Sequence, residues 1–311
     1  MTSRRFEVLS VNISTAKGTT KQPVAEAAIA AQGLAGDAHA GAGNRQVSLL
    51  ASETIARFGA EAGRSFKPGE FAENITTRGV DLDRVAPLDR FLIGGAVLEV
   101  TQIGKACHAD GCAIFKEVGR CVMPQAGIFC RVLQPGAIRP GDAGEYAPRP
   151  LRIRIVTLSD RASRGDYEDR SGPRARELMA EFFRPKRWHV EFETAVLPDD
   201  AERLRRELLA ARDAGVDVVV TSGGTGVGPR DITPETVTAV CDKMVPGIME
   251  AIRAKYGAAN PHACLSRSVA GVAGTTLIYA LPGSPRAVEE YLREILLTLE
   301  HVILMVHGLG H

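Results

Sequence analysis

The stretch Val216-Asp-Val-Val-Val-Thr-Ser-Gly-Gly-Thr-Gly226 joins a run of β-branched residues to a glycine-rich turn. β-Branched side chains favour extended backbone, and a short apolar run of this kind is typical of a buried parallel strand. The closely spaced glycines let the main chain approach a ligand and turn successive N–H groups toward an anion. We therefore predict a buried strand that ends in an anion-binding loop, and a tight turn without a ligand is the alternative.

Around this stretch the chain alternates between strand and helix patterns. Ile153–Leu158 is a second β-branched run, and Asp200 is a candidate N-cap for a helix. The last helix is expected to begin just after Pro285, with an apolar stripe formed by Val288, Leu292, Ile295, Leu299, Val302 and Val306. We expect residues 151–311 to form an α/β domain, an open and mostly parallel sheet with helices on both faces.

Open α/β sheets bind ligands at the carboxyl ends of their strands, so chemistry is expected in the loops after Leu158, Val196, Thr221 and Leu281. Asp199 and Asp231 lie in two of these loops. Carboxylates repel a phosphate unless a cation bridges them, and Mg²⁺ is commonly held by one or two carboxylates and the substrate's phosphates. We predict a site for a nucleotide and Mg²⁺. Alternatively, Asp199 and Asp200 only cap a helix and Asp231 is a turn residue.

The first half of the chain has a different pattern. Phe6–Ile13, Phe91–Ile103 and Gly127–Leu133 are apolar runs that predict strands separated by turns. The prolines near Pro148 favour extended backbone and disfavour a continuing helix, so we place a domain boundary there. The prediction is a β-rich barrel over residues 1–147.

Length and composition support two globular domains. The 311 residues are about twice the usual size of one domain. The formal net charge of +1 gives no electrostatic bias toward nucleic acid. No apolar run is long enough to span a membrane, and no signal sequence follows Arg4 and Arg5. We expect a cytoplasmic protein that binds neither nucleic acid nor a membrane.

Four of the six cysteines crowd into one part of the first half: Cys107, Cys112, Cys121 and Cys130. Together with His108, the first three contain the ligand types of a zinc site, although their spacing is not a common zinc pattern. Burial as inert packing residues is the alternative, and Cys130, inside an apolar run, is its best candidate.

Motifs in the second half occur in an order that resembles the molybdopterin adenylyltransferase family over residues 152–308. They are Leu158–Ser163, Asp169–Pro173, Leu197–Asp199, Thr221–Gly226, Pro229–Glu235, Leu265–Ser268 and Leu281–Pro285. The resemblance implies the transfer of AMP from ATP to the terminal phosphate of molybdopterin, with release of pyrophosphate. It also implies hand-over of the product to a molybdate-insertion protein, and a homo-oligomer, typically a trimer.

The same resemblance implies roles for individual residues. Asp199 and Asp231 match the family's essential acids, and we assign them to Mg²⁺ and ATP. Arg230 either neutralises phosphate charge or is a solvated loop residue. Pterin and nucleotide binding is assigned to Asp160, Ser222, Gly223, Gly224, Thr225, Gly226, Ser266, Ser268, Pro282, Gly283 and Ser284.

The first half looks like a MOSC domain over residues 6–146. The matching motifs are Gly36–His39, Arg45–Leu50, Gly69–Ile75, the cysteine region and Pro135–Asp142. The resemblance implies a β-rich fold that binds molybdenum cofactor or carries sulfur through a cysteine. Cys112 is the first candidate for that cysteine and Cys107 the second.

Alternatives to an adenylylating enzyme remain at this point. The chain could carry molybdopterin without turning over ATP, contain a zinc-stabilised interaction module, or act on another phosphorylated substrate. The sequence does not distinguish molybdenum from tungsten, and direct transfer of an intermediate between the two domains is a further hypothesis.

Overall fold

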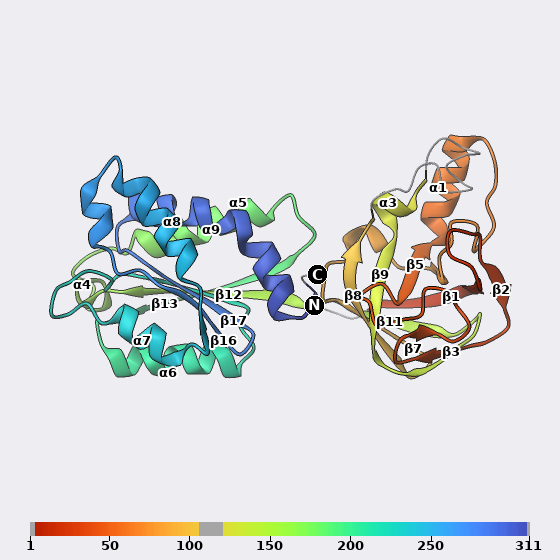
Figure 1. Cartoon of the computed structure of the whole chain (residues 1–311), viewed down its shortest axis with the longest axis horizontal. Helices are drawn as coiled ribbons and strands as arrows, with labels where there is room; N and C mark the ends of the chain where they lie inside the picture. Colours follow the sequence, from red (N-terminus) through yellow and green to blue (C-terminus); the bar gives the residue numbers. More distant parts are fainter. Residues whose placement is uncertain (1–3, 106–120, 310–311) are drawn as a thin grey trace. The chain divides into compact units, whose positions relative to one another are not determined.

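The computed structural model describes residues 4–105 and 121–309, which form two compact units. The first comprises Met1–Arg149 with Arg187–His189, and the second comprises Pro150–Lys186 with Val190–His311. Figure 1 shows strands wound around a core in the first unit, and a sheet between two layers of helices in the second. No described helix is long and apolar enough to cross a membrane.

The sheet of the first unit closes on itself. Its strands follow the order β11-β7-β8-β9-β5-β6-β1, and β11 also pairs with β1, which makes the predicted barrel. Only β5 and β6 pair in parallel among these neighbours. The strands are β1 (Arg4–Ile13), β5 (Val47–Ala51), β6 (Ile75–Arg78), β7 (Arg90–Ile93), β8 (Ala96–Ile103), β9 (Ile128–Gln134) and β11 (Ala143–Ala147).

Smaller elements surround this barrel. Strand β2 (Gln22–Val24) extends the sheet beside β1, and β10 (Gly136–Ile138), β3 (Ala27–Ala30) and β4 (Gly33–Leu34) form a second small sheet. Among the described residues of the first unit, the helical segments are α1 (Ser52–Ala62), η1 (Leu82–Arg84) and α3 (Met123–Ala126). The predicted apolar run Phe91–Ile103 is a hairpin, β7 and β8, because Gly94 and Gly95 both adopt positive φ.

Aromatic and aliphatic side chains fill the barrel. Phe6 and Phe91 meet edge to face with their ring centroids 5.7 Å apart, and Tyr146 packs beside Phe91. Cys130 is fully buried in this core, as predicted for an inert packing residue. Burial raises the pKa of its thiol, so the reactive thiolate is disfavoured.

The second unit is the predicted α/β fold. Its sheet has the order β13-β12-β14-β17-β16-β15, in which β12, β14 and β17 are parallel. Strand β16 pairs antiparallel with β17, and β15 pairs antiparallel with β16. Figure 1 shows α5, α8 and α9 on one face and α6 and α7 on the other. The strands are β12 (Pro150–Leu158), β13 (His189–Leu197), β14 (Val218–Ser222), β15 (Lys243–Met244), β16 (Ala270–Ala273) and β17 (Thr276–Leu281).

Two helices of the second unit begin where the sequence signals place them. Asp200 caps α6 by accepting a hydrogen bond from the Arg203 N–H, and Ser284 caps α9 in the same way. In α9 the buried stripe passes through Ile303 at its end, so Val302 and Val306 are only partly buried. The helices are α4 (Asp160–Ser163), α5 (Ser171–Phe183), α6 (Ala201–Asp213), α7 (Thr233–Val240), α8 (Pro246–Gly257), η3 (Pro261–Leu265) and α9 (Pro285–Val306).

Candidate active site

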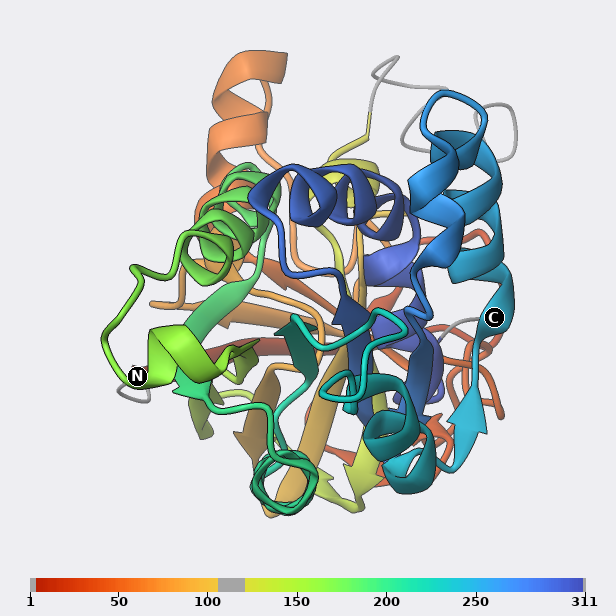
Figure 2. The same ribbon diagram turned by 90° about the vertical axis from the view of Figure 1, so that its left-hand side faces the viewer.

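The loops after β12, β13, β14 and β17 surround a cavity of about 820 Å³, at the end of the second unit that faces the viewer in Figure 2. Most residues predicted for the site line it: Asp160, Asp199, Ser222, Gly223, Gly224, Thr225, Gly226, Asp231, Ser266, Pro282, Gly283 and Ser284. Ser268 is not part of the lining; it is buried behind it, and its hydroxyl oxygen is 2.7 Å from that of Ser266.

The glycine loop can be built only from glycine at two positions. Gly223 has a φ of 111°, and a Cβ there would lie 2.3 Å from the Leu158 carbonyl oxygen. Gly224 has a φ of 64°, and its Cβ would lie 2.5 Å from Thr233 Oγ1. Thr233 is fully buried and fixes the loop, because its N–H and its hydroxyl donate to the carbonyls of Gly224 and Gly223. The loop therefore has a defined shape without a bound ligand.

Two acids from different strand ends hold each other in place. The Asp160 N–H donates to Asp199 Oδ2 at 3.0 Å, and the Asp199 N–H donates to Asp160 Oδ1 at 3.1 Å. The Arg230 guanidinium donates to the Asp160 carboxylate, with its Nη2 2.7 Å from Oδ2. This guanidinium holds the pKa of Asp160 below its ordinary value. Burial raises the pKa of Asp199, and the nearby carboxylates of Asp160 and Asp231 act in the same direction.

Asp231 lies directly against the glycine loop. Its Oδ2 accepts a hydrogen bond from the Gly228 N–H at 2.8 Å. A Cβ on Gly226 would lie 2.7 Å from the same oxygen, so only glycine lets this carboxylate come so close. The loop N–H groups and the charge of Asp231 thus share one wall of the cavity.

Serines and the N-terminus of a helix also line the cavity. Ser266 Oγ is 3.3 Å from Thr225 Oγ1, and Ser222 Oγ donates to the Pro282 carbonyl oxygen at 3.2 Å. Ser284 and Pro285 line the cavity at the N-terminus of α9, where the free N–H groups of a helix favour negative charge. Anion-binding groups and carboxylates therefore face one space, which suits a phosphate accompanied by a cation.

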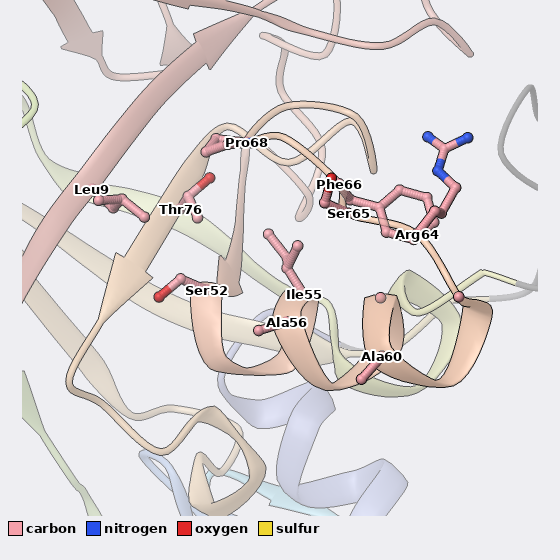
Figure 3. Close-up of a pocket in the computed structure, with 12 residues that line it drawn as sticks. Leu9, Ser52, Ile55, Ala56, Ala60, Arg64, Ser65, Phe66, Pro68 and Thr76 are labelled. Atoms are coloured by element: carbon pink, nitrogen blue, oxygen red, sulfur yellow. The ribbon is translucent and has the colours of Figure 1, made fainter.

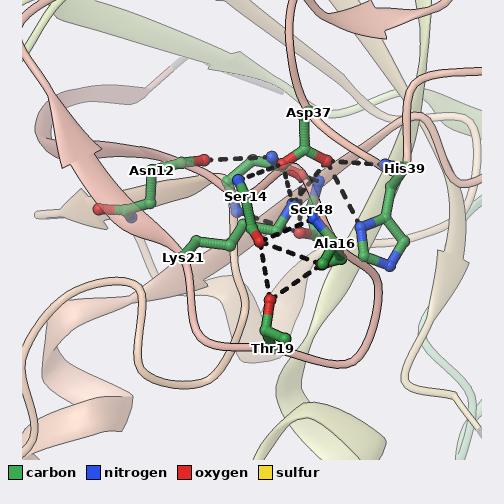
Figure 4. A network of polar contacts seen from close by, with 9 residues as sticks. Asn12, Ser14, Ala16, Thr19, Lys21, Asp37, His39 and Ser48 are labelled. Atoms are coloured by element: carbon green, nitrogen blue, oxygen red, sulfur yellow. Dashed lines mark hydrogen bonds and ion pairs between the residues drawn. The ribbon is translucent and has the colours of Figure 1, made fainter.

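The barrel contains a separate cluster of buried charges (Figure 4). Lys21 Nζ lies 2.8 and 2.7 Å from the two carboxylate oxygens of Asp37, and both side chains are almost completely buried. Asp37 also accepts from the N–H groups of Ser14 and His39. Burial lowers the pKa of Lys21, while the bond to Asp37 raises it. Lys21 and Asp37 were not among the predicted site residues.

Glu73 is a buried acid beside this cluster. Its Oε1 accepts from the Gly69 N–H at 2.6 Å and from Thr76 Oγ1 at 2.8 Å, whereas Oε2 has no hydrogen-bond partner among the described residues. Thr76 also lines a cavity of about 560 Å³ beside α1, together with Leu9, Ile55 and Phe66 (Figure 3). Burial raises the pKa of Glu73, so the folded barrel favours its neutral form.

This acid makes the stability of the barrel depend on pH. In the unfolded chain Glu73 ionises near its ordinary pKa of 4.5, whereas the folded barrel retains the proton to higher pH. The stability contributed by this difference is complete below pH 4.5 and is lost as pH rises through the folded-state pKa. We expect the free energy of unfolding to fall as pH rises above 4.5 in the wild type, and to fall less in Glu73→Gln.

The Cys130 thiol is buried in the barrel, so its labelling by N-ethylmaleimide across a urea titration reports unfolding of the barrel alone. Titrations at several pH values measure how the free energy of unfolding changes with pH in the wild type and in Glu73→Gln. The matched control is Glu70→Gln, since Glu70 lies on the same loop and is partly exposed beside Arg64. Equal pH dependence in the wild type and Glu73→Gln would contradict the assignment of this titration to Glu73.

Family comparisons divide the chain in the same way. A family model described as a probable molybdopterin binding domain matches residues 154–301, and one described as a MOSC domain matches residues 36–145. Molybdopterin adenylyltransferase of Helicobacter pylori strain J99 is 36% identical over 160 residues, which are 51% of this chain and 89% of the relative. Through its second unit, the chain belongs to the molybdopterin adenylyltransferase family. Its first unit is a MOSC domain, so both predicted resemblances are confirmed.

Other proteins match the same region. Molybdopterin adenylyltransferase of Escherichia coli K12 is 35% identical over 160 residues, 51% of this chain and 80% of the relative. A crystal structure of a molybdopterin biosynthesis enzyme from Thermus thermophilus is 37% identical, covers 51% of this chain and 97% of its own, and has a TM-score of 0.45.

The adenylyltransferase unit contains cavity residues that the sequence analysis left without a role. His262 and Tyr167 line the cavity, and the Arg161 guanidinium lies 5.4 Å from the centre of the Tyr167 ring. Asp169 also lines it, and accepts from Thr157 Oγ1 and the Ser171 hydroxyl. Asp169 belongs to the motif Asp169–Pro173 of the family resemblance, so the sequence contained a signal that could have identified it as a site residue. No sequence pattern identifies Tyr167 or His262 as site residues.

The donor set fits Mg²⁺ bound together with a nucleotide. Asp199 and Asp231 lie in the loops after β13 and β14, which flank β12 in the sheet, and the Asp231 carboxylate helps to raise the pKa of Asp199. Among the described residues no three His, Cys, Asp or Glu side chains gather as a metal cage. Mg²⁺ is usually held by one or two carboxylates plus substrate phosphates, and two acids beside an anion-binding loop provide that arrangement.

The predicted MOSC cysteines, Cys112 and Cys107, lie outside the described residues, as does His108 of the zinc hypothesis. Cys121, the remaining member of that hypothesis, is partly buried and packs against the apolar cluster that includes Phe58 and Met123. The described part of the barrel therefore leaves the cysteine assignments as predictions.

Proposed function

We propose that this chain is an enzyme of molybdenum cofactor biosynthesis whose second unit transfers AMP from Mg²⁺-ATP to the terminal phosphate of molybdopterin. The observation that carries the proposal is the meeting of Asp199 and Asp231 with the glycine loop at one cavity. The confirmed family supports the identity of the substrate, because its curated members are named for this reaction.

In this reaction a terminal phosphate oxygen of molybdopterin attacks the α-phosphorus of ATP. A new P–O bond forms, the bond from the α-phosphorus to the bridging oxygen of the β-phosphate breaks, and pyrophosphate leaves with that electron pair. Catalysis of phosphoryl transfer is mainly positioning and neutralisation of charge. Mg²⁺, when bound, supplies charge neutralisation at the phosphates.

The chain's own residues bind and orient the reactants. The N–H groups of the glycine loop and of the α9 N-terminus face the phosphates, and Asp199 and Asp231 hold the cation. Arg230 is bonded to Asp160 at the rim of the cavity and is largely exposed, so a phosphate can take the place of Asp160 as its partner. Asp160, Ser266 and Ser268 belong in this proposal to the binding of pterin and nucleotide.

For the MOSC unit we propose binding of molybdenum cofactor or relay of sulfur through Cys112 or Cys107. Its fusion to the adenylyltransferase unit raises the local concentration of a shared pterin intermediate. We also propose that a molybdate-insertion protein receives the product and that the chain assembles as a trimer. If the two units, separated and mixed, match the full chain in rate and product yield, an intermediate is not transferred directly between them.

The test measures release of pyrophosphate and formation of adenylylated molybdopterin by the full chain. Both products are expected only when ATP, Mg²⁺ and molybdopterin are all present. Tight binding of molybdopterin without formation of either product would show that the protein is a molybdopterin carrier and not this enzyme. Turnover of ATP with another phosphorylated acceptor, but not with molybdopterin, would replace the substrate.

A further inference from the structure

The segment between η3 and β16 runs along the glycine loop and presents alternate residues to opposite sides. Ser266 lines the cavity, and Ser268 lies behind it within 2.7 Å of the Ser266 hydroxyl. Arg267, between the two serines, is absent from the lining. Its own N–H donates to the Thr225 carbonyl oxygen at 2.8 Å, so the segment is bonded to the glycine loop at this residue.

The Arg267 side chain reaches three further points of the site's framework. Its Nε donates to the Gly226 carbonyl oxygen at 2.6 Å, and its Nη2 donates to the Asp231 carbonyl oxygen at 2.9 Å. Its Nη1 forms an ion pair with Glu235 in the first turn of α7. One guanidinium therefore joins the glycine loop, the main chain of Asp231 and the helix that follows.

These bonds fix the direction of groups that face the ligand. In a planar trans peptide the N–H points away from the C=O, so holding the Thr225 and Gly226 carbonyls on one side turns the next N–H groups to the other. Holding the Asp231 carbonyl likewise sets the backbone from which its carboxylate projects. Because only a planar fork of donors serves these acceptors together, lysine cannot replace arginine here.

We infer that Arg267 is a positioning residue of this site, which holds the glycine loop and Asp231 in the geometry that binds the phosphates and the cation. The inference rests on the proposed function for its catalytic consequence, but the fixed loop geometry is a property of the ligand-free chain. Arg267 itself does not line the cavity.

The test compares Arg267→Lys with the matched control Arg253→Lys in the full chain. Arg253 Nη1 donates to the Ser268 carbonyl oxygen at 2.9 Å, so it bonds the same segment, but none of its bonds to the described residues reaches the glycine loop. Amide hydrogen exchange of residues 223–232 is measured without ligand, and the steady-state rate and the Mg²⁺ concentration for half-maximal activity are measured with ATP and molybdopterin.

In Arg267→Lys we expect the loop amides to exchange about ten times faster and kcat/KM to fall by about 100-fold, with a higher Mg²⁺ requirement, because small misplacements of a positioned group have effects of this size. Arg253→Lys is expected to match the wild type in all three. Arg267→Gln, which keeps fewer donors, is a second variant if Arg267→Lys does not fold, and should show the same pattern.

Unchanged loop exchange in both Arg267 variants would overturn the inference, whatever their activity. Faster exchange with unchanged kcat/KM would overturn its catalytic part. A wild-type chain that forms no adenylylated molybdopterin would instead refute the proposed function, and the exchange comparison would still decide whether Arg267 fixes the loop.

Discussion

Asp199→Asn and Asp231→Asn are each expected to lower the rate of adenylyl-molybdopterin formation by about 1,000-fold, the upper range for loss of one preorganised electrostatic group in an active site. Asparagine keeps the shape and one oxygen of each side chain but removes the negative charge. Both carboxylates line the cavity that the anion-binding loop also lines, so in the proposed function loss of either leaves the cation of Mg²⁺-ATP with too few ligands.

Neither variant should disrupt the fold around the cavity. The main-chain N–H of Asp199 and that of Asp160 each donate to the side-chain carboxylate of the other residue. Asparagine at position 199 can still accept the hydrogen bond from the Asp160 N–H. The rim therefore keeps its shape, and we expect a higher Mg²⁺ requirement with little change in folding. Asp231 Oδ2 accepts from the Gly228 N–H, and asparagine at 231 keeps one oxygen that can accept this bond.

Asp200→Asn is the matched control for this experiment. Asp200 is adjacent to Asp199 but caps α6, and asparagine is as good an N-cap as aspartate. Its rate should stay within about twofold of the wild type. The measurement is formation of adenylylated product over a range of Mg²⁺ concentrations, with circular dichroism as the check on folding. Wild-type rates in either Asp199→Asn or Asp231→Asn would contradict the assignment of the cation to these acids.

Local sequence signals predicted those parts of the α/β unit that depend on neighbouring residues. The β-branched run at Val218–Ser222, the cap at Asp200 and the proline after Ser284 each determine an element within a few residues. Because parallel strands end at one edge of a sheet, the gathering of the strand-end loops followed from the fold class. The antiparallel pairing of β16 was not predicted, although β16 forms a tight hairpin with β17 in which Ala273 pairs with Thr276. Strand β15 did not follow either, since it pairs with β16 through residues distant in sequence.

Groups that act through long-range contacts were not predictable in this way. Arg267 stands between two serines that the family motif marks, but its bonds to Gly226 and Asp231 join segments that are adjacent only after folding. The same holds for Lys21 and Asp37 in the barrel. A lone lysine in a polar stretch predicts a solvated side chain, and only the closed sheet places it away from water.

Breaking the buried Lys21–Asp37 pair is expected to have the largest effect on the stability of the barrel. Removing one partner of a buried ion pair typically costs about 3–5 kcal/mol, because the remaining charge is left without compensation. Lys21→Met should be near the lower end of this range, since Asp37 keeps the hydrogen bonds from the Ser14 and His39 N–H groups. Asp37→Asn should cost more at neutral pH, because the ammonium loses its charge partner.

The pH dependence distinguishes these two variants. In Asp37→Asn, Lys21 can avoid a buried unpaired charge by releasing its proton, which costs about 1.4 kcal/mol for each pH unit below its ordinary pKa of 10.5. A lysine whose folded-state pKa is lowered destabilises the fold at low pH, and this cost disappears as pH approaches the unfolded value. The deficit of Asp37→Asn should therefore shrink between pH 7 and pH 9, while that of Lys21→Met stays nearly constant.

Labelling of the buried Cys130 thiol across a urea titration measures both deficits in the barrel, and the double variant Lys21→Met/Asp37→Asn completes the cycle. If the pair is a coupled unit, the double variant is more stable than the sum of the single losses predicts, because neither charge remains to be buried alone. Glu73 lies close enough to influence Lys21, so its ionisation in Asp37→Asn would reduce the loss and its pH dependence. Additive losses that are constant with pH would mean that Lys21 and Asp37 are each held by their other neighbours and not by one another.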